Sequence, residues 1–333
     1  MPAVLSQLQV PNEMRHSKQS MEVAAAAKVL DVLENHAYRF IFLLQVCMLI
    51  ATGQAAVGFY LAAFALAGWS SGVVLGIAIA ARMAVSHFGG ALAPAVLRRL
   101  APRLSFLLCS VGLVLPVTLT LIVDAAWQIV VALFLLEVAS TGFSATFRGT
   151  ALSILRSDPD RKRSVNLVSL ASNLESALTP LIAALLLGIA GTEALMIGSY
   201  ATILASIILA IFADLPRSMS PIPSKGQIVG LRAGLDLLRD RSFRGIIAMN
   251  IVFVAAASMI LVNTPVLAMA VFGRSEVAVA IALAVFGFGS IAGIVLALQI
   301  SARIPASATA LFGAALVSSG LFIGSLADAF GAF

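Results

Sequence analysis

Nine apolar stretches follow one another along the chain, each close to the ~20 residues that an α-helix needs to cross a bilayer. They cover about 39–66, 71–97, 104–123, 126–148, 165–190, 194–213, 245–271, 276–301 and 307–328. Inside lipid every backbone N–H and C=O must find an internal partner, and continuous apolar stretches of this length do so as helices. The pattern therefore predicts an all-α membrane protein, a bundle of transmembrane helices.

Composition agrees with this class, since 61% of the 333 residues are hydrophobic and only 11% are charged. The net charge of +6 does not indicate a nucleic-acid partner, because the basic residues stand in the connections between apolar stretches. Cys47 and Cys109 lie inside such stretches, without CxxC or metal-ligand spacing. The sequence has no His-Glu-x-x-His, Gly-x-Ser-x-Gly or P-loop pattern. We therefore expect no metal, no cofactor and no enzymatic activity.

Lysine and arginine are concentrated in every second connection, which predicts the orientation of the chain. Of the other connections, the first, third and fifth have none and the seventh has only Arg274. The basic segments are those before the first span and after the second, fourth, sixth and eighth. They contain Arg15, Lys18, Lys28 and Arg39; Arg98, Arg99 and Arg103; Arg148, Arg156, Arg161, Lys162 and Arg163; Arg217, Lys225, Arg232, Arg239, Arg241 and Arg244; and Arg303. The amino terminus and these connections are thus expected in the cytoplasm, with the lipid bilayer of the inner membrane around the spans.

A long connection near the middle divides the chain into four expected regions. Residues 1–37 form a cytoplasmic tail without signal-peptide features, and 38–213 form a six-helix bundle. Residues 214–243 are expected to form a linker, because the proline- and serine-rich segment LPRSMSPIPSKG lies at their start. Residues 244–333 are expected to form three more helices. A shift of 205 residues lays Tyr38-Arg39 on Phe243-Arg244 and Arg98 on Arg303, as in transporters built from parallel repeats.

The repeat predicts a second half as long as the first. Six spans precede the linker and three follow it, against an expected six plus six. A complete second half would run to about residue 418, so about 85 residues are expected beyond Phe333. On this interpretation the chain is truncated after its ninth helix.

Four stretches resemble the major facilitator superfamily, and in particular bacterial efflux permeases related to drug and siderophore exporters. They are LGIAIAARMAVSHFGGALAPAVLRRLAPRL (75–104), WQIVVALFLLEVASTGFSATFRGTAL (127–152), SVNLVSLASNLESALTPLIAALLL (164–187) and RSFRGIIAMNIVFVAAASMILVNTPVLAMAVFG (241–273). The resemblance extends from Tyr38 to about Asp328. It implies a two-bundle transporter whose first, fourth and seventh helices line a central cavity, and it suggests proton-coupled antiport.

Two family motifs are only partly present. The family places Gly-x-x-x-Asp-Arg and a basic run between its second and third helices. Here Gly90, Arg98 and Arg99 remain, but Pro94 and Ala95 stand where Asp and Arg are expected. Of the glycine- and proline-rich antiporter signature on the fifth helix, only Pro180 is present. Proton coupling is therefore implied by the relatives rather than by a motif.

Three ionisable residues stand near the middle of their spans. Counted from the span ends, Arg82, Glu137 and Glu175 each lie roughly 15–16 Å deep. Charges at this depth usually face a bundle interior or a hydrated cavity. Glu137 is a candidate proton carrier or cation contact, and the alternative is a structural ion pair with Arg82. Glu175 is a candidate for the same role, although its neighbouring Ser and Thr residues also suit helix–helix hydrogen bonding.

Polar amides on the first and seventh spans are further candidates for the cavity lining. They are Gln45, Asn250 and Asn263, and helix packing would explain them equally well. The leading hypothesis is a secondary active transporter that exports a small amphipathic molecule by alternating access, with protons as the expected coupling ion. The alternative is a truncated member of the same family that transports nothing. The sequence does not indicate the oligomeric state.

Overall fold

The structure is a computed structural model, and it describes residues 31–97, 100–155, 157–213, 215–216, 245, 255–256, 259–301 and 306–325. Nearly all of the predicted tail and linker, together with Asn250, Arg98 and Arg99, lie outside these residues. Every regular element within the described ranges is helical, as the hydropathy predicts.

The first six predicted spans form five helices. These are α2 (His36–Ala67), α3 (Ser71–Leu97), α4 (Pro102–Ile122), α5 (Ala126–Ile154) and α6 (Asp158–Phe212). The helix α6 contains two predicted spans, joined where Ala190 and Gly191 leave helical geometry. Gly191 has a φ of 65°, a left-handed conformation that glycine adopts at little cost. The chain turns there between its fifth and sixth membrane crossings.

The later spans are represented by three pieces. Helical residues 259–265 run into η4 (Val266–Val271), a π-helix that begins directly after Pro265. Proline lacks the N–H that would continue the α-helical hydrogen bonds, which explains the change of helix type at this point. The helices α9 (Glu276–Ser301) and α10 (Ala306–Ser325) follow, close to the predicted eighth and ninth spans.

Length and composition support the membrane assignment. Five described helical stretches are long and apolar enough to cross a bilayer. One of them, Asp158–Phe212, contains two predicted spans, and another, His36–Ser86, contains the first predicted span and part of the second. Trp69 and Trp127 flank the first and fourth spans at the same predicted face, with 70% and 65% of their surface exposed. Exposed tryptophans at this position are typical of membrane–water interfaces.

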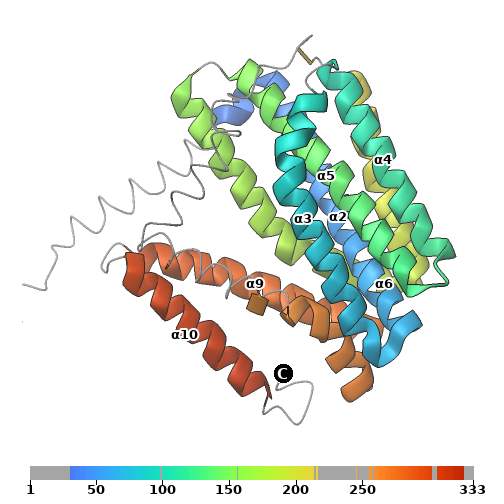
Figure 1. The fold of residues 1–333 in the computed structure, drawn as a ribbon. Coiled ribbons are helices and arrows are strands. Elements are labelled where there is room, and N and C mark those ends of the chain that lie inside the picture. Colours follow the sequence, from blue (N-terminus) through green and yellow to red (C-terminus); the bar gives the residue numbers. More distant parts are fainter. Residues whose placement is uncertain are drawn as a thin grey trace, which may run out of the picture.

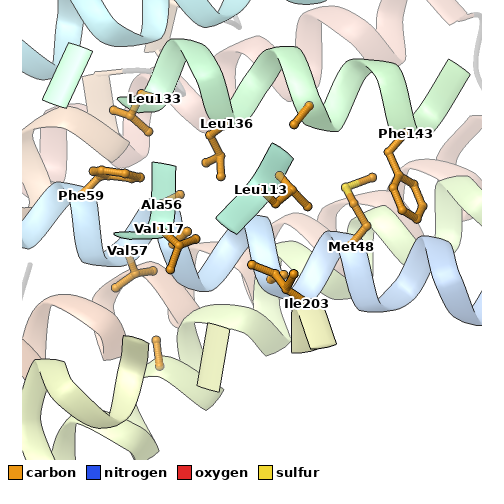
Figure 2. Close-up of a cluster of buried hydrophobic side chains, with 14 of the residues drawn as sticks. Met48, Ala56, Val57, Phe59, Leu113, Val117, Leu133, Leu136, Phe143 and Ile203 are labelled. Atoms are coloured by element: carbon orange, nitrogen blue, oxygen red, sulfur yellow. The ribbon is translucent and has the colours of Figure 1, made fainter. Parts of the chain in front are cut away.

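The helices α2 to α6 form one bundle, and α9 and α10 lie together on one side of it (Figure 1). Figure 2 shows the centre of this bundle, where Met48 and Phe59 of α2 face Leu133, Leu136 and Phe143 of α5. Leu113 and Val117 of α4 close this core, and both are at most 1% exposed. Interhelical hydrogen bonds add to it: the Ser110 and Ser206 hydroxyls lie 2.8 Å apart between α4 and α6.

The helix α9 packs against α6 of the bundle, and one contact between them is especially close. A Cβ atom at Gly287 of α9 would lie 2.5 Å from the Cα of Ala177 in α6 and would overlap the carbonyl oxygen of Ser176. Only a residue without a side chain allows two helix backbones to approach in this way. The seam between the bundle and α9 therefore passes next to Glu175, the residue before Ser176.

Candidate functional site

Arg82 and Glu137 form an ion pair between α3 and α5. The Nε of Arg82 donates a hydrogen bond of 3.0 Å to Oε2 of Glu137. The two side chains are 30% and 14% exposed, so the pair lies largely inside the protein. This is the pairing that the sequence offered as the structural alternative for Glu137.

Glu175 supplies a second carboxylate near the same guanidinium. Arg82 interacts electrostatically with Glu175 of α6, besides its bond to Glu137. Three helices of the bundle, α3, α5 and α6, thus contribute charged groups to one cluster. A single positive charge shared by two carboxylates leaves the cluster with one net negative charge when both are ionised.

The position of Glu175 depends on a glycine in the first span. A Cβ atom at Gly53 would lie 2.6 Å from Oε1 of Glu175 and 2.6 Å from Cγ2 of Thr179. Gly53 therefore leaves the space into which the carboxylate extends. Within the described residues Glu175 has neither a hydrogen bond nor an ion pair at bonding distance, in contrast to Glu137.

Gln45 belongs to α2, its side chain extends toward α5, and it is 3% exposed. Its Nε2 is 3.5 Å from the hydroxyl of Ser144, and its Oε1 has no hydrogen-bond partner. The buried oxygens Gln54 Oε1 and Thr179 Oγ1 are also without partners. Buried polar atoms are normally satisfied, so such atoms mark places where water or a ligand is needed.

The remaining candidates lie elsewhere. Asn263 is beside Gly72 near the start of α3, with its Oδ1 3.7 Å from where a Cβ of Gly72 would be. It therefore touches the first half of the chain near the predicted outer face, away from the charge cluster. Gly90 is within α3, and the structure describes neither Asn250 nor the arginines 98 and 99.

Sequence reasoning missed two features of this region. Arg148 was counted with the basic connection, but α5 continues to Ile154 and holds it inside the helix. Its spacing from Glu137 and Ser144 would have placed all three on one helical face. The role of Gly53 had no signal in the sequence, because it depends on a contact between helices far apart along the chain.

Comparison with known proteins identifies the family. The model of the Major Facilitator Superfamily matches residues 41–333, which is most of the chain. The chain belongs to the Major Facilitator Superfamily. As a member it is a multi-pass membrane protein and a transporter, not an enzyme.

A solved structure agrees at the level of the fold. The crystal structure of a mutant of the nucleoside transporter NupG is similar to this member of the superfamily with a TM-score of 0.57 and 12% identity. The match covers 79% of this chain and 67% of the other. A comparison with curated protein sequences gave no significant match.

Proposed function

We propose that this transporter exports a small amphipathic molecule across the bacterial inner membrane, in the manner of drug or siderophore permeases, in exchange for protons. Its amino terminus and basic connections lie in the cytoplasm. Residues 38–213 and 244–333 belong to two bundles, joined by 214–243, that rock about a central site.

The observation that carries the proposal is the sharing of Arg82 by two carboxylates. Glu137 holds the guanidinium at 3.0 Å, while Glu175 lies near the same cation without a bonded partner. A carboxylic acid away from water is more stable when neutral, and an unpaired one gains most from a proton. Glu137 is thus the structural partner of Arg82, and Glu175 is the proton carrier.

The location of Glu175 explains how a proton could bias a conformation. The next two residues, Ser176 and Ala177, form the close contact with Gly287 of α9. A change of charge at Glu175 therefore takes place at the seam between the bundle and the second half of the chain. Interfaces of this kind have discrete arrangements that a local charge can favour differently.

The proposal is tested by accumulation and transport measurements on the chain. We expect cells that lack the gene to accumulate at least one amphipathic toxic compound, and a plasmid carrying the gene to reverse this. Everted membrane vesicles should then take up that compound when a proton gradient is imposed. An uncoupler should abolish the uptake. Uptake that ignores the uncoupler would refute proton coupling, and the absence of any affected compound would refute export.

A further inference from the structure

Arg148 occupies an unusual place on α5. From Ala139 to Leu155 it is the one exposed residue, and its neighbours Phe147 and Gly149 are buried. It lies six residues before the last residue of the helix, Ile154, or about 9 Å inside at 1.5 Å per residue. A charged side chain at such a depth is stable where it faces water or an anion.

The helix aligns Arg148 with the polar residues of the site. Glu137, Thr141, Ser144 and Arg148 follow at spacings of four, three and four, which place them on one face of α5. Glu137 bonds Arg82 of α3, and Ser144 contacts Gln45 of α2. This face is therefore turned toward the inside of the bundle at two levels, and Arg148 continues it toward the basic connection.

Three acidic residues at this end of the bundle are paired with other arginines. Asp158 pairs with Arg161, and Asp31 and Asp160 both pair with Arg163. Within the described residues Arg148 has no hydrogen bond and no ion pair. Among the described residues this cation of α5 is therefore without a counter-ion.

Gln45 of α2, which contacts Ser144 one turn before Arg148, contributes a second unsatisfied group. Its Oε1 is buried and has no donor, although its Nε2 reaches Ser144. The guanidinium of Arg148 would be stabilised by an anion, and the carbonyl oxygen of Gln45 by an O–H or N–H donor.

We propose that Arg148, Ser144 and Gln45 form a binding site for a small organic anion, one with a carboxylate or phosphate next to a hydroxyl or N–H group. The inference rests on the proposed export function and names the substrate class for it. A phospholipid headgroup has similar chemistry. Gln45 is 3% exposed between α2 and α5, however, which favours a ligand that enters the bundle.

The test is equilibrium binding of radiolabelled salicylate, an amphipathic carboxylate with an adjacent hydroxyl, to the purified chain in phosphatidylcholine nanodiscs. We expect saturable binding, weakened about tenfold or more by Arg148→Gln, because a hydrogen bond to a charged group contributes about 1.5–3 kcal/mol. Arg148→Lys should retain most of the affinity. Arg39→Gln, which removes an exposed arginine at the start of α2, should change nothing. Gln45→Leu should abolish the preference for salicylate over 2-methoxybenzoate, which has no donor.

Several results would overturn the site. They are the absence of salicylate binding, equal binding by the Arg148→Gln protein, and equally tight binding of uncharged salicylamide. A different outcome would be that phosphatidylglycerol in the nanodisc displaces salicylate from the wild type but does not change binding by the Arg148→Gln protein. In that case the ligand is a lipid headgroup, and the proposal that the site binds the exported substrate is wrong. Binding requires no transport, so a protein that binds salicylate but moves no compound keeps the site and loses the proposed function.

Discussion

Exchange of Glu175 for glutamine is expected to reduce proton-driven transport at least about 100-fold, the usual minimum effect of removing a group that transfers a proton in a rate-determining step. The amide retains the size of the side chain, so it still fits the space beside Gly53. It cannot bind and release a proton, and the cluster then has one carboxylate for one guanidinium. The measurement is uptake by everted vesicles with and without an imposed proton gradient.

Matched variants separate the loss of a proton carrier from a general defect. Glu193→Gln removes an exposed carboxylate from the same helix, α6, and should leave uptake unchanged. Glu175→Asp keeps a titratable group and should retain part of the activity. If the Glu175→Gln protein reaches the membrane in normal amounts and still responds to the proton gradient, Glu175 is not the proton carrier. Glu137→Gln would then be the next variant to measure, because Glu137 is the other carboxylate on Arg82.

Exchange of Arg82 for methionine is expected to lower the free energy of unfolding by about 3 kcal/mol, since removal of one partner of a largely buried pair leaves an uncompensated charge. Here the uncompensated charge is that of Glu137, the carboxylate bonded to Arg82. A further exchange of Glu137 for methionine should restore part of this loss. Chemical unfolding of the purified proteins in detergent measures both changes.

A surface ion pair provides the control for that experiment. Asp158→Asn breaks the pair with Arg161, in which the Asp158 side chain is 86% exposed, so the effect should stay below about 1 kcal/mol. Equal stability of the Arg82→Met protein and the wild type would mean that the cluster is well hydrated. An additive double variant would mean that Arg82 and Glu137 do not interact.

The sequence predicted the fold well because membrane spans depend on properties that a single chain displays. The apolar stretch 104–123 predicted the helix α4, which the structure places at Pro102–Ile122. The stretch 276–301 predicted α9, which is observed at Glu276–Ser301. The turn between the fifth and sixth spans was also expected, and Gly191 provides it. The fourth span was predicted to end at Arg148, its first arginine. The helix α5 instead continues to Ile154, because backbone hydrogen bonding does not stop at a charged side chain.

The site was predicted only in part, for a physical reason. Equal depth in the membrane brought Arg82, Glu137 and Glu175 together as candidates, but depth does not determine which face of a helix meets which neighbour. The choice of Glu137 as partner of Arg82 depends on the side-by-side arrangement of α3 and α5. The space for Glu175 depends on Gly53 in α2. Both are tertiary contacts without a periodic signal in the sequence.

The central claim is that Glu175 lies on a hydrated path inside the bundle and not against lipid. The most direct measurement uses Glu175→Cys in a chain whose two free cysteines, Cys47 and Cys109, are replaced by alanine. We expect a charged, membrane-impermeant thiosulfonate to label this cysteine, with a rate that depends on the side of addition. If only lipid-soluble maleimides react, from either side alike, then Glu175 faces acyl chains and the transport path proposed here does not exist.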